Sequence, residues 1–222
     1  DRALGRDIVD VQGADTRALE RMFLRICLQP GGMWNESEVS RDLGISRPTV
    51  ARYLRILEEA FLVFRLANLA SPVKGQPKVF LVAPALRQAL LGLDAEAVRM
   101  PDQWGRLAEN AVAATLLGTR PDAQQVGFWR KGDDECDVGA LQLPGQTEYL
   151  EVKRSGPRAV RCITAAAQAL ATPGWGMVLT VAHEVAALPA RAPLRGAVRM
   201  SAAAWLYHQR AASGGTLRFR PG

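Results

Sequence analysis

The 222-residue sequence is poor in the residues that form zinc sites and disulfide frameworks. It contains three cysteines, no CxxC pair and only two histidines. Structural zinc sites use closely spaced Cys and His ligands, and disulfide scaffolds need several paired cysteines, so neither is expected here. Because disulfides persist in oxidising compartments, this cysteine usage favours a cytoplasmic location.

Long apolar runs and nucleotide-binding loops are also missing. No stretch approaches the roughly 20 consecutive apolar residues that a membrane-spanning helix requires, so no membrane partner is expected. The charged N-terminus DRALGRDIVD resembles neither a secretory signal nor a transit peptide. It does not begin with Met, which suggests a processed form or a piece of a longer protein. The pattern GxxxxGK[ST] is absent, so no P-loop ATP site is expected in this chain.

The net charge of +6 and the pI near 9.7 favour polyanionic partners only weakly. The basic residues are mainly arginines, and they are spread evenly between the two halves of the sequence instead of forming a cluster. Charge alone therefore does not identify a nucleic-acid-binding protein.

The first half has the pattern of a helix-turn-helix unit. Apolar residues in the segment that begins at Thr16 follow the i, i+3, i+4, i+7 spacing of an amphipathic helix, with Thr16 as its cap. Asn35 is placed to cap a short helix that ends at Gly44. Ser46 is placed to cap the next helix, which has Pro48 in its first turn. Two short helices joined by a Gly-containing turn are typical of helix-turn-helix proteins.

Two β-rich runs, FLVFRLAN and KVFLVAP, follow this pair of helices, and a Pro/Gly loop separates them. They predict a hairpin, the wing of a winged helix, with a closing helix over residues 85–91. In the DNA-reading form of this unit, the early residues of the second helix enter the major groove and the wing contacts phosphate. The predicted DNA contacts are Arg47, Thr49, Arg52, Arg55, Lys74 and Lys78. The same unit also serves as a protein-docking module, and this alternative stays open.

The second half predicts a mixed α/β layer. A helix over residues 104–118 is followed by the strand-like runs QQVGFWRK, DECDVGALQL and EYLEVKRS, by an Ala-rich helix, and by the strand WGMVLTVA. Alternation places Glu151 and Lys153 on one face with Tyr149, and Leu150 and Val152 on the other. The fold class expected for the whole chain is therefore α/β (α+β).

Four polar residues in this frame are candidates for a metal site. Asp137 and Glu151, on adjacent predicted strands, supply the carboxylate oxygens that Mg²⁺ prefers, and Glu109 interrupts an otherwise apolar helix. Lys153 would orient a water molecule or neutralise charge that develops on a phosphate. Gln168, on the Ala-rich helix, would add a hydrogen bond. Glu151 and Lys153 alone would be explained equally well by a surface ion pair.

Together, the runs LGISRPTVARYLRILEEAFLV, WGRLAENAV, FWRKGDDECDVGAL and YLEVKRSG resemble the C-terminal region of a large group of prokaryotic AAA+ ATPases. In that region a winged helix precedes a domain similar to the PD-(D/E)XK nucleases, and the similarity covers roughly residues 7–180. The resemblance implies that Glu109 and Asp137 are metal-binding acids, that Glu151 and Lys153 form the (D/E)-x-K pair, and that Gln168 is the helical glutamine. It also implies an ATPase partner, which here lies outside the chain.

The expected organisation is a winged helix in residues 1–95 and a nuclease-like domain in residues 96–222. The expected function is that of a DNA-associated module with a Mg²⁺-dependent nuclease-like site. Two alternatives stay open, since a fold does not imply an activity. One is a non-catalytic DNA-binding or regulatory module, and the other is a protein-interaction domain with an apolar patch around Trp104 or Trp205. A homo-oligomer is compatible with each of them.

Overall fold

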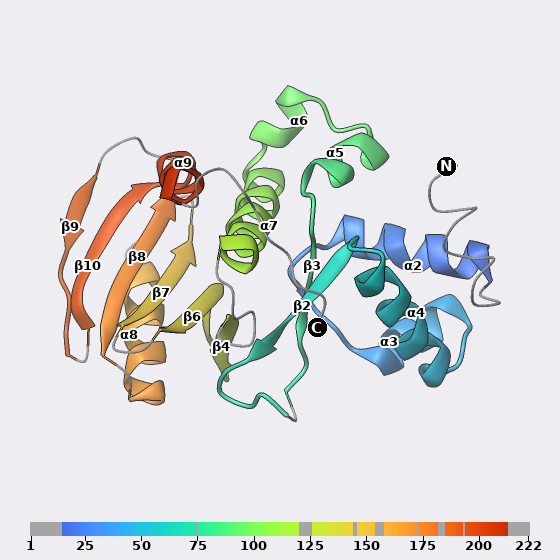
Figure 1. Ribbon diagram of the computed structural model, residues 1–222, viewed down its shortest axis with the longest axis horizontal. Helices are drawn as coiled ribbons and strands as arrows, with labels where there is room; N and C mark the ends of the chain where they lie inside the picture. The colour runs from blue at the N-terminus through green and yellow to red at the C-terminus, as the bar shows by residue number, and fades with distance from the viewer. Residues whose placement is uncertain are drawn as a thin grey trace.

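The chain folds into a mixed α/β structure of helices packed on mixed sheets (Figure 1). The computed structural model describes residues 15–73, 75–119, 126–143, 146–153, 158–171, 173–181, 185–192 and 194–212. The helices are α2 (Thr16–Leu28), α3 (Glu36–Leu43), α4 (Arg47–Glu59), α5 (Ala85–Leu91), α6 (Ala95–Arg99), α7 (Pro101–Thr119), α8 (Arg158–Leu170) and α9 (Ala202–Ala212). The strands are β1 (Gly32–Met33), β2 (Val63–Asn68), β3 (Lys78–Leu81), β4 (Gly127–Lys131), β5 (Asp134–Cys136), β6 (Val138–Leu143), β7 (Gln146–Val152), β8 (Gly174–Thr180), β9 (Ala186–Leu188) and β10 (Leu194–Ser201).

The helix boundaries in the N-terminal part follow the capping residues. The Asn35 side chain accepts hydrogen bonds from the backbone at the start of α3, and Gly44 ends α3 with a left-handed φ of 67°. Ser46 caps α4, whose first turn contains Pro48, as the sequence predicts. The cap of α2 is Asp15 instead of Thr16, because the Asp15 carboxylate accepts hydrogen bonds from the first turn and Thr16 is already helical.

The apolar stripe of α2 packs on α3, α4 and the neighbouring strands. Leu19, Met22, Phe23 and Ile26 are all buried, which confirms the predicted amphipathic helix. Burial of each such side chain contributes roughly 1.5–3 kcal/mol, so this stripe is what holds the short helices together. The result is a compact helical unit at one end of the molecule (Figure 1).

The strands of the described residues form two five-stranded sheets. The first has the strand order β1-β3-β2-β4-β5, in which a short parallel pairing of β2 with β4 joins the N-terminal strands to the second half of the chain. The second has the order β6-β7-β8-β10-β9, with parallel pairs in its centre and antiparallel pairs at its edges. Both sheets are mixed, as the fold-class expectation requires.

Helices cover the two faces of the second sheet. Leu150 and Val152 of β7 share one apolar cluster with α7 and α9, whereas Tyr149 shares another with α8. This alternation confirms the predicted two-faced strand, since successive side chains of a strand point to opposite sides. Glu151 lies on the α8 side of β7 together with Tyr149.

One expected strand is interrupted in the structure. The run DECDVGALQL forms β5 and β6, which belong to different sheets, and Asp137 lies between them. The chain changes sheet at this residue because β5 pairs with β4 and β6 pairs with β7. The single strand predicted over these residues is therefore wrong, and Asp137 lies at the junction of the two sheets.

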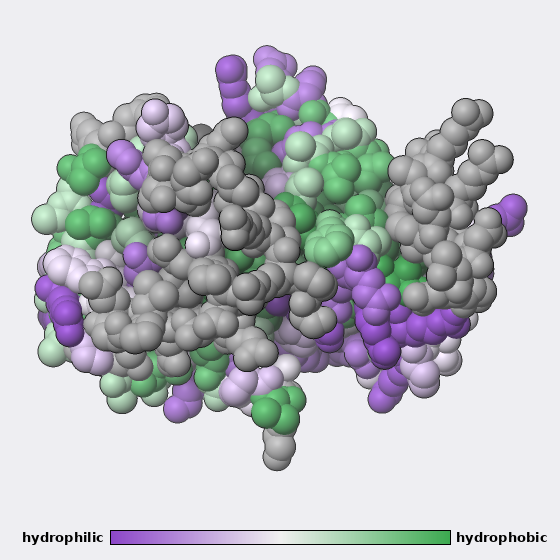
Figure 2. Space-filling model, viewed as in Figure 1, coloured by the Kyte–Doolittle hydropathy of each residue, from purple (hydrophilic) through white to green (hydrophobic). Residues whose placement is uncertain are grey.

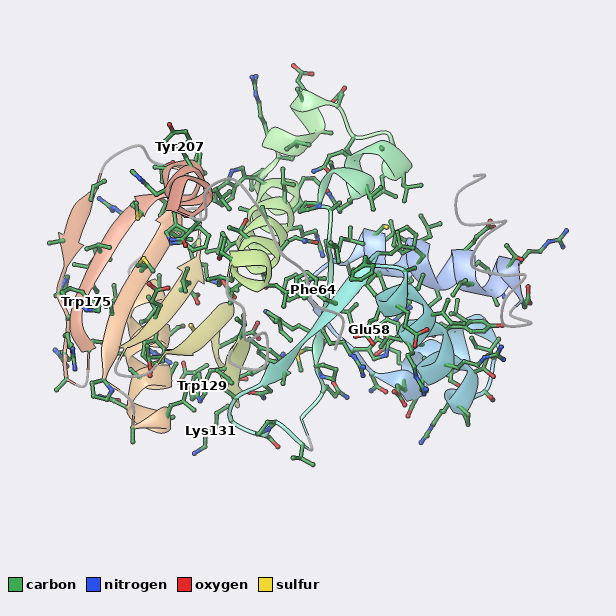
Figure 3. The ribbon with its side chains drawn as sticks, in the orientation of Figure 1. Glu58, Phe64, Trp129, Lys131, Trp175 and Tyr207 are labelled. Carbon is green, nitrogen blue, oxygen red and sulfur yellow. The ribbon has the colours of Figure 1, made fainter. Side chains whose placement is uncertain are left out.

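The described part of the chain contains no helix with the length and apolar character needed to cross a membrane. Trp205 is buried and therefore does not centre an exposed apolar patch, whereas Trp104 is partly buried. Apolar side chains do gather on the surface over α5 and its surroundings (Figure 2), where Leu90 is exposed. Two of the exposed aromatic residues, Trp175 on β8 and Tyr207 on α9, lie away from each other (Figure 3).

Candidate functional site

The candidate site is built around Asp137, at the point where the chain passes from one sheet to the other. Its backbone N–H donates a hydrogen bond of 3.0 Å to Glu151 Oε2 on the neighbouring strand β7. Val138 pairs with Leu150 in the antiparallel ladder, and this register places Asp137 beside Glu151. Asp137, directly before β6, and Glu151 of β7 therefore lie side by side, although Asp137 is not within a strand as predicted.

Lys153 completes the outer half of this arrangement. Its Nζ lies 3.1 Å from Asp137 Oδ2 and 3.1 Å from Glu151 Oε1. Glu151 is fully buried and Asp137 nearly so, whereas the Lys153 side chain is 44% exposed. No described residue donates a hydrogen bond of acceptable geometry to Glu151 Oε1. This oxygen is instead held by the ion pair with Lys153. Lys153 is the member of this group that has room to move.

Lys78 forms the inner half of the site. Its Nζ lies 2.8 Å from Glu109 Oε1 on α7 and 2.6 Å from Glu135 Oε1 on β5, and it donates a hydrogen bond of 3.2 Å to the Asp137 carbonyl oxygen. It also lies 5.3 Å from the centre of the Phe128 ring, within the range of a cation–π contact. A buried ammonium therefore gathers Glu109, Glu135 and the Asp137 backbone.

The pKa values of the site follow from its burial. Burial, reinforced by the charge of Asp137, raises the pKa of Glu151 to about 8, although Lys153 and the Asp137 N–H oppose the shift. Burial also raises the pKa of Glu109 to about 7, against the attraction of Lys78. For Lys78, burial alone would lower the pKa, but the surrounding carboxylates outweigh it and raise the pKa above its usual value. The site thus keeps its ammonium groups charged and two of its carboxyl groups easily protonated.

We expect this shift to make the contribution of Glu151 to stability fall with pH. A carboxyl whose pKa is higher in the folded state than in the unfolded state stabilises the fold below pH ~4.5, and that stabilisation is lost as the pH rises to about 8. Glu151→Gln removes this titration, so the parent should lose at least about 1 kcal/mol relative to the variant between pH 5 and pH 8.5. Urea unfolding at both pH values measures the difference.

The control for that measurement is Glu20→Gln, on an exposed position of α2. This variant should follow the parent at both pH values. An unchanged difference between the parent and Glu151→Gln from pH 5 to pH 8.5 would show that Glu151 has an ordinary pKa.

Two of the predicted site residues lie elsewhere or play another part. Gln168 is exposed on α8, in a groove of about 430 Å³ that it shares with Arg161 and Arg191, and not among the carboxylates. Lys78 was expected to contact phosphate on a wing, but it is 3% exposed and its ammonium is bound to two carboxylates. That expectation does not fit the observed position, because a buried and paired ammonium is not available to a nucleic-acid backbone. Lys74 lies outside the described residues.

The predicted DNA contacts of α4 lie on its accessible side. Arg47, Arg52 and Arg55 are exposed, and Thr49 is partly buried, with its hydroxyl 2.8 Å from that of Ser46. Acidic side chains occur in the same region, since Glu58 of α4 binds Arg65 through both carboxylate oxygens. The helix therefore presents arginines from Arg47 to Arg55, followed by Glu58, which is ion-paired with Arg65.

Glu135 and Lys78 are site residues that the sequence reasoning did not select as ligands or as a buried cation. Strand alternation places Glu135, two residues before Asp137, on the same side of the strand, so this spacing could have identified Glu135 as a site residue. The residues around Lys78 gave no indication that it is buried, because a lysine at the start of an apolar strand is usually exposed to solvent. Its burial depends on α7 and β5, which are distant in the sequence.

The donor set of the site suits a hard divalent cation, which takes carboxylate and water oxygens. The buried Glu151 Oε1 without a hydrogen bond, beside Asp137, is the position that such an ion would use. Within the described residues, no group of three or more His, Cys, Asp or Glu side chains is already arranged around a common point for a metal. The ammonium groups of Lys78 and Lys153 lie between the carboxylates instead.

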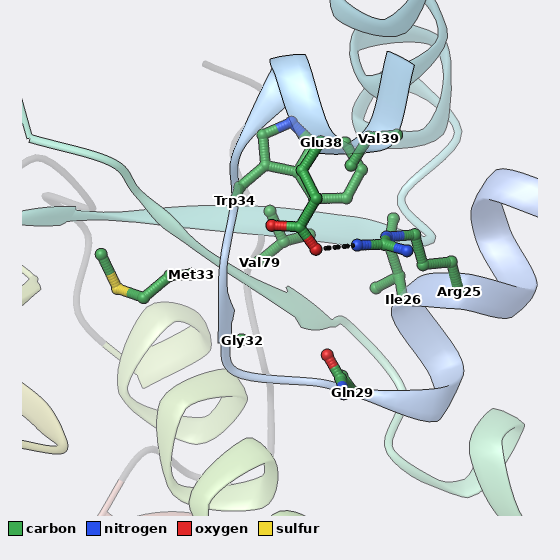
Figure 4. Close-up of a pocket in the computed structure, with 9 residues that line it drawn as sticks. All are labelled: Arg25, Ile26, Gln29, Gly32, Met33, Trp34, Glu38, Val39 and Val79. Carbon is green, nitrogen blue, oxygen red and sulfur yellow. Dashed lines mark hydrogen bonds and ion pairs between the residues drawn. The ribbon is translucent and has the colours of Figure 1, made fainter. Parts of the chain in front are cut away.

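A small hollow elsewhere is unrelated to this chemistry. It has a volume of about 50 Å³ and lies between α2, α3 and β3, where Arg25 and Glu38 form an ion pair of 2.7 Å (Figure 4). The indole N–H of Trp34, which also lines it, is buried without a hydrogen-bond partner among the described residues. A space of this size holds one or two water molecules and no substrate.

Comparisons with known proteins match this chain to a family and to relatives of unknown function. A family model described as a domain of unknown function (DUF8612) matches residues 1–97. The chain is 27% identical over 146 residues to the uncharacterized protein Mb2031c of Mycobacterium bovis and, equally, to the uncharacterized protein Rv2008c of Mycobacterium tuberculosis. The aligned part is 62% of this chain but 32% of each relative, so it spans about a third of their length. No solved structure matches.

Proposed function

We propose that this chain is a nucleic-acid-associated module with a Mg²⁺-dependent, nuclease-like site. The observation that carries the proposal is the convergence of Asp137, Glu151 and Lys153, two buried carboxylates and one partly exposed ammonium within ion-pair distance. This is the combination expected of a (D/E)-x-K site, in which carboxylates hold a metal ion and a lysine faces the phosphate. Glu109 contributes from α7 through the network of Lys78.

Asp137 and Glu151 would hold the ion. When bound, Mg²⁺ supplies Lewis acidity to a phosphoryl oxygen and acidifies a water molecule. Lys153 would release its carboxylate partners and turn toward the phosphate, because its side chain is the exposed one of the three. Burial of Glu151 keeps bulk water from this side of the site.

The N-terminal part would act as a winged helix that binds DNA. The tight turn at Gly44 between α3 and α4, and the antiparallel pairing of β2 with β3, support this assignment. Arg47, Arg52 and Arg55 would face the nucleic acid from α4. The resemblance to AAA+ ATPases adds the proposal that a P-loop ATPase region, in the same longer protein or in a partner chain, controls the module.

The test is a calorimetric titration of Mn²⁺ and Mg²⁺ into the parent and into the double variant Asp137→Asn/Glu151→Gln. The parent should bind the ion, and the variant should bind it at least about 10-fold more weakly, because the ligands lose their charge while their shape is kept. The matched control is Glu38→Gln/Asp42→Asn, which removes two carboxylates that pair with Arg25 on the surface. Absence of binding to the parent, or equal binding by all three proteins, would contradict the proposal.

A second candidate function is non-catalytic DNA binding, which the pairing of every site carboxylate with a lysine favours. In that case the cluster is a structural network and α4 determines the function. Arg47→Ala/Arg52→Ala should then weaken duplex DNA binding and lower the salt slope by roughly 0.9 per lost phosphate contact, without any metal dependence. Arg17→Ala on α2 is the control, and unchanged binding by the α4 variant would exclude this helix as the DNA contact.

A further inference from the structure

Lys78 is the only described residue of the site that comes from the N-terminal part of the chain. It is the first residue of β3, which lies between β1 and β2 in the first sheet. Its ammonium forms ion pairs with Glu109 on α7 and Glu135 on β5. Its side chain is 4% exposed and makes both ion pairs at 2.8 Å or less. Few lysines are buried to this extent, and those that are need charged partners that repay the loss of solvation.

The charges of the site divide into two halves. Glu109 and Glu135 have Lys78 between them, whereas Asp137 and Glu151 have the exposed Lys153. Glu135 has a second, more distant cation, since Arg130 Nη1 lies 3.4 Å from its Oε2. Formally, the four carboxylates therefore exceed the positive charges of Lys78, Lys153 and Arg130 by one. The Lys78 ammonium is enclosed, with 4% of its side chain exposed, whereas the Lys153 side chain is 44% exposed and can turn into solvent. A metal ion could therefore replace Lys153 between Asp137 and Glu151, but it could not replace Lys78 between Glu109 and Glu135.

We propose that the Lys78 ammonium occupies a cation position of this site permanently, so that the chain binds a single divalent ion at Asp137 and Glu151. This inference rests on the proposed function for the outer position, and it adds a role for the inner one. Lys78 is then a positioning residue, which holds Glu109 and Glu135 in place as a metal ion would. Because Lys78 belongs to β3, the arrangement of the site depends on the N-terminal part of the chain. A chain without β3 would lack this cation.

The experiment replaces the inner cation by empty space. Lys78→Ala removes the ammonium and the three carbons beyond Cβ, and it leaves room for an ion with its water ligands between Glu109 and Glu135. Mn²⁺ binding is counted by electron paramagnetic resonance of the free ion, and the unfolding midpoint is recorded in EDTA and in millimolar Mn²⁺. We expect a single ion on the parent, a second ion on Lys78→Ala, and a larger rise of the midpoint with Mn²⁺ in the variant.

The matched control is Lys78→Ala/Glu109→Gln/Glu135→Gln, which has the same space without the two carboxylates. It should bind no second ion. If Lys78→Ala does not fold in EDTA, the inference requires that Mn²⁺ restore its circular dichroism spectrum, and failure to do so overturns it. Equal ion numbers on the parent and Lys78→Ala, or a second ion on the control, would also overturn it.

The two proposals fail in different ways. An absence of Mn²⁺ binding by the parent removes the proposed outer ion site. If Lys78→Ala binds no more Mn²⁺ ions than the parent, Lys78 does not occupy a cation position, whatever number of ions the parent binds. A parent without an ion and a Lys78→Ala variant with one would keep the role of Lys78 at the inner cation position and remove the proposed outer ion site.

Discussion

Lys78→Met is expected to destabilise the protein by about 3–5 kcal/mol, one of the two largest effects predicted for a single substitution here. Methionine keeps an unbranched side chain of similar length, but it removes the charge between Glu109 and Glu135 and the cation–π contact with the Phe128 ring. Glu109 is then left without an ion-pair partner among the described residues, Glu135 keeps only the more distant Arg130 at 3.4 Å, and the Asp137 carbonyl loses a donor. Urea unfolding in EDTA at pH 7.5 measures the loss.

The control for this substitution removes the charges that Lys78 neutralises. Lys78→Met/Glu109→Gln/Glu135→Gln should recover most of the lost stability, because replacing a whole buried ion group by neutral residues costs far less than removing one partner. Full stability of Lys78→Met alone, within about 1 kcal/mol of the parent, would mean that water solvates Glu109 and Glu135 in the folded protein.

Asn110→Leu is expected to cost about 2–4 kcal/mol, although leucine fills a similar volume in an apolar helix. The Asn110 side chain is 1% exposed and pairs reciprocally with the backbone of Leu81: it accepts from the N–H at 3.1 Å and donates to the carbonyl at 2.6 Å. Strand β1 pairs with β3 only at Lys78 and Val79, so this amide continues the hydrogen bonding where β1 ends. Leucine would leave both Leu81 groups buried without partners.

Thr119→Val is the matched control for Asn110→Leu because it also removes a side-chain hydrogen bond on α7. The Thr119 hydroxyl donates to the Thr115 carbonyl at 2.8 Å in a partly exposed position, where water can replace it. Its loss should stay below about 1 kcal/mol. Equal effects of the two substitutions in thermal and urea unfolding would contradict a special role for Asn110 at the edge of β3.

The local features of the fold were predictable because they depend on neighbouring residues. Caps such as Asn35 and Ser46 act within three residues, and the left-handed turn at Gly44 depends on the missing side chain of one residue. The alternation of Tyr149, Leu150 and Glu151 likewise follows from strand geometry alone. Each of these predictions agrees with the structure.

The break of a strand at Asp137 was not predictable in the same way. The run from Asp134 to Leu143 has continuous strand character, and nothing in its composition marks a change of sheet. The change results from β4 pairing with β5 while β7 pairs with β6, two contacts made by other segments of the chain. The same break makes the Asp137 N–H available to Glu151.

From the sequence alone, the mixed α/β class, the caps and the turn of α3 and α4, and the closeness of Asp137, Glu151 and Lys153 were predictable. These depend on periodicity, capping and short separations along the chain. Only the tertiary structure decided that Lys78 is buried among Glu109 and Glu135 and that Gln168 faces a groove outside the site. The physical reason is that a side chain's burial and charge partners are set by segments far away in sequence, here β3, α7 and β5, which meet only in the folded chain.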